Sequence, residues 1–206
     1  MRKIQILFVV LFLASCASAP KKVVFFDNPI PFDQSEIAWA KEKGKTKVYG
    51  SSYIVDNLGL NGTTHTCVGY TAWLLPDSGY NRAYLTYLFG NLNESFWNHK
   101  GSVPFKEQRT LEGDNKGYYL ESKCDVEGNF AFLDVPDGTF YLVTTAYYVG
   151  GPFRTFPPDY KGGMFLKKIV VSGQDEIRAV LTLWTTTVDD TAPHQPRKKR
   201  ELTRAM

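Results

Sequence analysis

Catalytic and metal-binding residues are scarce in this chain of 206 residues, which has three histidines and three cysteines. His65, His99 and His194 lie far apart and lack the spacing of a zinc site, which needs three or four converging ligands. The sequence has no Gly-x-Ser-x-Gly elbow, His-Glu-x-x-His helix, phosphate-binding loop or dinucleotide-binding glycine motif. Acidic pairs such as Asp189 and Asp190 have nothing to set the separation that a glycosidase requires. We therefore expect no enzymatic activity, no cofactor and no bound metal.

A long apolar span and a basic face are also missing. Residues 4–13 form an apolar stretch that only Gln5 interrupts, and this stretch is too short to cross a bilayer as a permanent helix. The formal net charge of the chain is +3, of which residues 1–15 supply +2 and residues 194–206 supply +4. Residues 16–193 are therefore mildly acidic, with a net charge of −3. Because nucleic-acid binding usually requires a basic face on the fold, we expect no nucleic-acid partner.

The first residues have the features of a secretion signal followed by an attachment point for lipid. A charged start and the apolar stretch lead into Leu13-Ala14-Ser15-Cys16, which resembles the lipobox of bacterial lipoproteins. The resemblance implies that residues 1–15 are removed and that Cys16 is acylated, which makes the lipid bilayer a partner. The residue after this cysteine is Ala17 and not aspartate, which resembles lipoproteins that are sorted to the outer membrane. The alternatives are an ordinary signal peptide cleaved further along, with Cys16 incidental, and a short buried helix.

The cysteine count is odd, and lipidation of Cys16 leaves Cys67 and Cys124 as an even pair. In an oxidising compartment such a pair usually forms a disulfide, which here would close a loop of 57 residues. Chain-entropy reasoning gives about 3–4.5 kcal/mol of stabilisation for a loop of that size. The alternatives are two buried free thiols or a redox pair, but the sequence has no Cys-x-x-Cys spacing. We favour the structural disulfide.

The C-terminal segment, residues 185–206, is basic and polar. Residues 197–200 are Arg-Lys-Lys-Arg, with Pro193 and Pro196 just before them. One interpretation is contact with anionic lipid or with acidic cell-wall polymers. The other, which the prolines and polar neighbours favour, is a solvated and disordered tail.

Two short helices are expected in an otherwise β-rich chain. The first covers residues 35–43, with Asp33 or Ser35 as its N-cap and Gly44 at its end. The second covers residues 80–89, where helical spacing places three residues on one side: Tyr84, Tyr87 and Leu88.

Short runs rich in β-branched and aromatic residues predict seven strands. They are expected at residues 47–55, 70–75, 118–123, 129–135, 139–149, 164–171 and 177–184. Phe130 and Phe132 share one face of their strand, because side chains alternate along it. Residues 125–129 and 136–138 predict turns, and the second resembles a tight hairpin that links two core strands. Residues 91–116 are expected to form a long insertion.

The most specific pattern lies in residues 124–142. It has the spacing D-x-x-G-x-F-x-F-x-x-V-P-x-G-x-Y, carried by Asp125, Gly128, Phe130, Phe132, Val135, Pro136, Gly138 and Phe140. This pattern resembles the carboxypeptidase regulatory-like, or transthyretin-like, domain, with phenylalanine at the usual tyrosine position. Residues 66–76 resemble another strand of that family, C-x-G-x-x-V-x-L-x-P. The resemblance implies a mainly β fold, a single sandwich with one or two short helices over residues 45–184. Residues 16–44 would then form a tether and the short N-terminal helix.

Aromatic residues in, and at the edge of, the segments that join the predicted strands are the candidate binding surface. They are Phe96, Trp97, Tyr148, Phe153, Phe156 and Tyr160. Such rings can bind sugar chains, peptidoglycan or a partner protein, since rigid rings bury area at low entropy cost. The alternative is that they pack the edge of the sandwich and cover loop backbone. Tyr147 and Tyr148 point to opposite faces of their strand, so at most one of the two belongs wholly to the core.

Together these patterns predict a bacterial cell-envelope lipoprotein, attached to the outer membrane and facing the periplasm. The resemblance carries no catalytic residues with it, because domains of this family serve as accessory or scaffold modules. The leading hypothesis is a non-catalytic structural or protein-interaction module whose partner is another envelope protein. The alternative is a module that binds glycan or peptidoglycan through the exposed aromatic loops.

Overall fold

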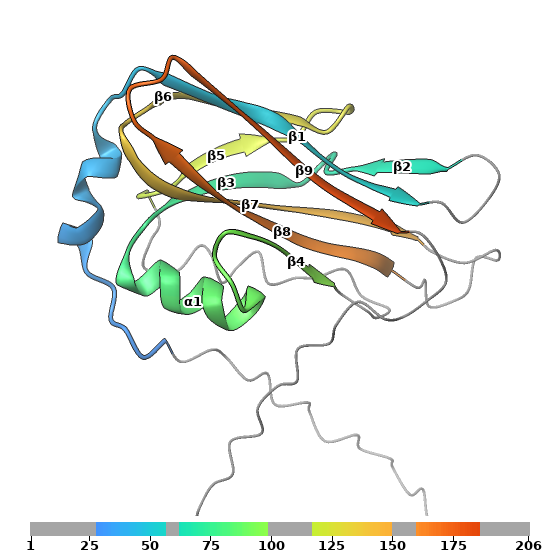
Figure 1. Ribbon diagram of the computed structural model, residues 1–206, viewed down its shortest axis with the longest axis horizontal. Coiled ribbons are helices and arrows are strands. Elements are labelled where there is room, and N and C mark those ends of the chain that lie inside the picture. Colours follow the sequence, from blue (N-terminus) through green and yellow to red (C-terminus); the bar gives the residue numbers. More distant parts are fainter. Residues whose placement is uncertain (1–27, 57–61, 99–116, 150–159, 186–206) are drawn as a thin grey trace, which may run out of the picture.

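The computed structural model describes residues 28–56, 62–98, 117–149 and 160–185, and these form two β-sheets packed as a sandwich (Figure 1). The four-stranded sheet contains β1 (Thr46–Asp56), β2 (Thr63–Thr66), β6 (Asn129–Val135) and β9 (Glu176–Thr185). The five-stranded sheet contains β3 (Thr71–Pro76), β4 (Glu94–Asn98), β5 (Leu120–Lys123), β7 (Gly138–Val149) and β8 (Tyr160–Val171). The predicted fold class, a mainly β sandwich with short helices, is confirmed.

Strand β1 organises the four-stranded sheet. Strand β6 pairs antiparallel with the first half of β1 and β2 with the second half. Strand β9 pairs parallel with β1 along its length, from Lys47 opposite Glu176 to Asp56 opposite Thr185. A strand has only two edges. Strand β9 therefore occupies one edge of β1, whereas β2 and β6 share the other edge.

The five-stranded sheet is antiparallel throughout, in the order β4-β8-β7-β3-β5. Its centre is the long pair β7 and β8, in register from Gly138 opposite Val171 to Val149 opposite Tyr160. Strand β4 lies inside the segment expected to be an insertion, and β2 was not expected as a strand at all. Both are short, and β2 is a run of Thr and His without an apolar alternation.

Two apolar clusters hold the layers together. The first fills the space between the two sheets and includes Val48, Ile54, Phe130, Phe140 and Leu142, all 3% exposed or less. The second lies on the outer side of the five-stranded sheet, beneath α1 (Gly79–Phe89), and includes Trp73, Leu75, Tyr141, Val143 and Leu85. The five-stranded sheet is therefore covered on both faces.

The first helix, η1 (Gln34–Lys41), is a 3-10 helix that begins after Asp33, one of the two predicted N-caps. The Asp33 carboxylate accepts a hydrogen bond from the Ser35 backbone N–H at 2.8 Å, which satisfies one of the helix's free donors. The helix ends before the expected Gly44, because Glu42 already has an extended backbone.

Ser78 is the N-cap of helix α1, and its hydroxyl accepts a hydrogen bond from the Asn81 backbone N–H at 3.1 Å. Gly90 is the C-cap, with φ 77°. Its buried side carries Asn81, Tyr84, Leu85 and Phe89. Tyr87, expected on that side, is 57% exposed, so the packed stripe lies further round the helix than predicted. Neither helix of the described residues combines the length and apolar character needed to cross a membrane.

The turn at residues 136–138 is not a hairpin, contrary to the prediction. Strand β6 before it belongs to the four-stranded sheet and β7 after it to the five-stranded sheet, so the chain passes here from one layer to the other. Gly138 is needed because Trp39 packs on it: a Cβ at this position would lie 2.3 Å from the Trp39 ring. The expected turn at residues 125–129 is present and also joins the two sheets.

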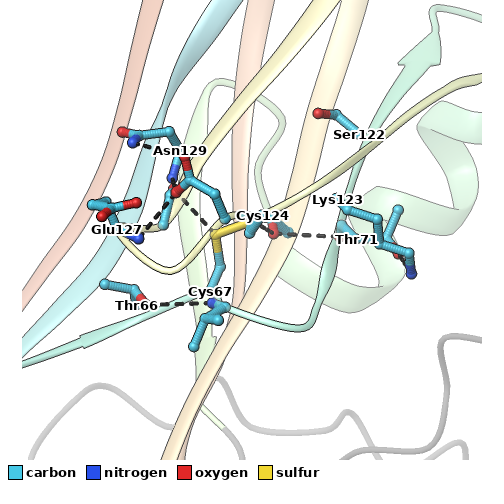
Figure 2. The surroundings of a disulfide bond; sticks show 12 residues. Thr66, Cys67, Thr71, Ser122, Lys123, Cys124, Glu127 and Asn129 are labelled. Atoms are coloured by element: carbon cyan, nitrogen blue, oxygen red, sulfur yellow. Dashed lines mark hydrogen bonds between the residues drawn. A yellow bond between two sulfur atoms is a disulfide. The ribbon is translucent and has the colours of Figure 1, made fainter.

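A disulfide joins Cys67 to Cys124, as predicted, with their Cα atoms 5.7 Å apart. Figure 2 shows that it links the residue after β2 to the residue after β5, and so one sheet to the other. The backbone N–H of Cys67 donates to Ser52 O at 3.1 Å and that of Cys124 to Tyr70 O at 3.0 Å. Both ends of the cross-link are therefore held by backbone hydrogen bonds.

Several predictions fall on residues outside the described ranges. These are the signal peptide at 1–15, the acylated Cys16, the tether, most of the insertion at 91–116, the basic tail, and the ring residues Phe153 and Phe156.

Candidate functional site

Phe96 and Trp97 lie in β4 and not in an exposed loop. Phe96 is paired with Phe165 of β8, their ring centroids are 4.8 Å apart, and both pack on the cluster between the sheets. Trp97 packs instead on the cluster beneath α1. Since neighbouring strand residues point to opposite faces, these two rings do not form one surface.

Tyr148 and Tyr160 are also on opposite faces of the five-stranded sheet. Tyr148 packs on the cluster between the sheets, whereas Tyr160 is paired with Val149 and therefore points to the outer side. Of the expected surface, Phe96 and Tyr148 thus face inward, and Trp97 and Tyr160 face the other way. The structure does not bring these four residues together into one patch.

His65 of β2 stacks on Tyr148 at one end of the sandwich. The two ring centroids are 4.1 Å apart and the ring planes differ by 7°, so the contact spans the two sheets. Burial lowers the pKa of His65, and the negative charge of Asp56 opposes this shift. In the described part of the chain no three His, Cys, Asp or Glu side chains lie close enough to hold a metal ion.

Tyrosines also gather on the outer side of the five-stranded sheet, near the end of β7. Tyr70 makes an edge-to-face contact with Tyr147, with ring centroids 5.7 Å apart. Burial raises the pKa of the Tyr70 hydroxyl, and the nearby Tyr160 adds to the shift. The Tyr70 phenol therefore stays protonated at neutral pH, and its ring serves as a packing group.

Another aromatic surface lies on the outer side of the four-stranded sheet. Strand β1 alternates between buried residues, such as Val48 and Ile54, and half-buried residues that point outward. We call the outward side the open face; it comprises Tyr49, Ser51, Tyr53 and Val55 of β1, Arg178, Val180, Thr182 and Trp184 of β9, and Asn129 and Ala131 of β6. Among the described residues no helix or further sheet packs over it (Figure 1).

The register of the strands arranges this face in rows. Tyr49 lies between Ala131 and Arg178, and Ser51 lies between Asn129 and Val180. Further along, Tyr53 is beside Thr182 and Val55 is beside Trp184, whose side chain is 62% exposed. From Tyr49 to Tyr53, aromatic and polar side chains therefore alternate along β1, and Val55 and Val180 add apolar surface to the face.

An open hollow of about 600 Å³ lies at one end of the open face, beside Tyr49. Lys47 places its ammonium 4.8 Å from the centre of the Tyr49 ring and 3.4 Å from a carboxylate oxygen of Glu176. Arg178 lines the other side. Lys123 contributes to the wall, but its ammonium is hydrogen-bonded to the Thr71 hydroxyl and so is turned away.

The rim of the hollow is fixed by the turn between β5 and β6. One Asp125 carboxylate oxygen accepts from the backbone N–H of Asn129 at 2.7 Å and of Glu127 at 3.0 Å. The other oxygen accepts from the Asn129 amide at 3.1 Å. Hydrogen bonds from Asn129, first of all its backbone N–H, lower the pKa of Asp125, so this carboxylate is charged at neutral pH. Asn129 is thus held at the edge of the open face.

Sequence reasoning missed Tyr49, Tyr53 and Trp184 as site residues. The signal was present, because Tyr49 and Tyr53 alternate with buried residues in a run with period two. The pattern shows which residues share a face, but only the packing of the second sheet and of α1 shows which face stays uncovered.

The comparisons with known proteins bear on the fold. No family model matches the sequence, and no curated protein matches it at a significant level. Among solved structures the chain is similar to PA1324 of Pseudomonas aeruginosa, which is described as a candidate carbohydrate-binding protein. The two are 22% identical, the TM-score is 0.53, and the match covers 74% of this chain and 98% of that one. At this level of identity the likeness shows a shared β-sandwich fold.

Proposed function

We propose that this chain is a non-catalytic carbohydrate-binding module of the bacterial cell envelope and that the open face holds the sugar. The observation that carries the proposal is the row of outward-pointing rings, half-buried Tyr49 and Tyr53 and exposed Trp184, on a sheet face that no described element covers. Glycan binding was the alternative in the sequence hypothesis. It now takes precedence over protein interaction, at a surface other than the one first expected.

The chemistry of the open face suits a sugar. One side of a pyranose ring is largely C–H, and it buries apolar area when it lies flat on an aromatic ring. The hydroxyls around the sugar ring need hydrogen-bond partners, which Ser51, Asn129 and Arg178 offer beside Tyr49. A face that alternates rings with short polar groups meets both needs. The similar fold of a candidate carbohydrate-binding protein supports the same conclusion.

Replacing Tyr49 with alanine is expected to weaken carbohydrate binding by about tenfold or more, which is about 1.4 kcal/mol. The loss follows from removing the ring that lies against the hollow. Retention of the full chain on a glycan array and on purified peptidoglycan measures the effect. The matched control is Tyr87→Ala on α1, a 57% exposed tyrosine away from the open face, which should bind like the wild type. The proposal fails if no carbohydrate is retained, or if both variants bind equally well.

The module is held at the membrane through lipid on Cys16, and its disulfide fits the oxidising envelope. Cys16→Ala is expected to move the protein from the membrane fraction to the soluble or uncleaved form, because the acyl chains are lost. Detergent partitioning of cell extracts measures this. Partitioning of the variant like the wild type would contradict the anchor without affecting the carbohydrate proposal.

A further inference from the structure

The open face is elongated along the strands. Tyr49 and Tyr53 are four residues apart on β1, which is about 13 Å in a strand. Trp184 lies beside Val55, two residues further on, so the rings extend over about 20 Å in total. One sugar ring contacts only one of these side chains at a time.

Polar side chains occupy the positions between the rings. Ser51 lies between Tyr49 and Tyr53 on β1, with Asn129 beside it on β6, and Thr182 lies beside Tyr53 on β9. Tyr49 and Tyr53 thus each lie near a hydroxyl or amide that can bond to the hydroxyls of a sugar lying along the face. A ligand that uses all of these groups must have repeated units that continue in one direction.

The shape of the face also limits how the ligand enters. The hollow beside Tyr49 is open, and the row continues past it to Tyr53 and Trp184 without an enclosing wall among the described residues. Such a face accepts the middle of a chain. A site for a chain end or a free monosaccharide surrounds most of its ligand instead.

We infer that the ligand is an internal stretch of an extended, β-1,4-linked glycan that lies along β1 and β9 and places non-adjacent sugars of one chain on Tyr49, Tyr53 and Trp184, because one sugar unit is shorter than the separation of about 13 Å between the first two rings. A β-1,4 linkage keeps the sugar chain straight and ribbon-like, so that one chain can reach all three rings. An α-1,4 linkage coils the chain, so that it would leave the face after the first ring. This inference rests on the proposed function, because it names the class of carbohydrate for the same face.

The test compares three series of oligosaccharides, from disaccharide to hexasaccharide, by calorimetry with the full chain. Two series are β-1,4-linked, of glucose and of N-acetylglucosamine, and one is α-1,4-linked glucose. We expect the affinity for at least one β-1,4-linked series to rise about tenfold from the shortest to the longest member, because only the longer members reach from Tyr49 to the further rings. The α-1,4-linked series should show no such rise.

Two variants locate the effect. Tyr53→Ala and Trp184→Ala should remove most of the rise with length, whereas the control Tyr87→Ala on α1 should keep it. Affinity that does not depend on length, or that rises equally for the α-linked series, overturns the extended-chain inference while carbohydrate binding stands. The same holds if peptidoglycan or an array glycan is retained but neither β-1,4-linked series binds. If no carbohydrate is retained at all, the proposed function itself is overturned.

Discussion

Replacing both Cys67 and Cys124 with alanine is expected to lower the free energy of unfolding by about 3–4.5 kcal/mol. The disulfide closes a loop of 57 residues, so its loss gives the unfolded chain much more conformational freedom. The two side chains are also buried, at 0% and 6% exposure, so a small cavity adds to the cost. Urea unfolding followed by tryptophan fluorescence measures the change.

Reduced wild-type protein is the control for this prediction. Reduction breaks the cross-link but keeps both sulfur atoms, so it separates the loss of the loop constraint from the loss of packing. We expect the reduced wild type to account for most of the destabilisation of the double variant. If oxidised wild type, reduced wild type and double variant all unfold at the same urea concentration, the disulfide contributes nothing to stability.

Gly50→Ala is expected to destabilise the fold by about 3 kcal/mol or more, because it forces two paired strands apart. Gly50 lies in the middle of β1 opposite Ala179 of β9, and a Cβ added to it would lie 1.6 Å from the Ala179 carbonyl oxygen. The obstacle is backbone, so no side-chain rotation relieves it. Since Arg178 and Trp184 lie on β9, carbohydrate binding should fall together with stability.

Gly79→Ala is the matched control for Gly50→Ala. Gly79 is the first residue of α1, and its nearest neighbours are the ends of side chains, with the Ile30 methyl at 3.2 Å. Alanine there should leave the free energy of unfolding within about 1 kcal/mol of wild type. Thermal unfolding and soluble yield of the two variants are the measurements. Equal stability of the two variants would show that β1 and β9 separate without cost.

Much of the fold follows from local pattern. Short runs rich in β-branched and aromatic residues predicted the strands now labelled β1, β3 and β6, the last with its bounds unchanged. Turn residues with a specific backbone need, such as Gly128 with φ 81°, marked where strands end. The cysteine count and the inferred compartment together led to the disulfide. Each of these rests on neighbouring residues or on composition.

Features that depend on pairing between distant segments could not be predicted from local sequence pattern. The turn before Gly138 looks like a hairpin, but it is a passage between sheets, because β6 pairs with β1 and β7 pairs with β8. Strand β4 exists because its residues extend the edge of β8, and its own sequence of five residues carries little signal. Phe96 and Trp97 were therefore expected in a loop and lie in a strand.

The candidate site likewise has a part that local pattern predicts and a part that depends on distant segments. That Tyr49 and Tyr53 share a face can be predicted from their spacing. That this face is open requires knowing that α1 covers the other sheet and that the four-stranded sheet has no such cover among the described residues. Trp184 joins them only through the parallel register of β9, which places it beside Val55 although more than a hundred residues separate them in sequence.

The parallel pairing of β1 with β9 also determines when the open face forms. Lys47 and Glu176, which begin this pairing, are 129 residues apart, so the ends of a very long loop must meet before the ladder closes. Pairing at such separation slows folding, since the chain loses loop entropy before any contact compensates for it. The face therefore assembles late, when the last described strand docks, and partly folded chains that lack this step display no complete row of rings. If the proposed function holds, carbohydrate binding would also report whether β9 has docked.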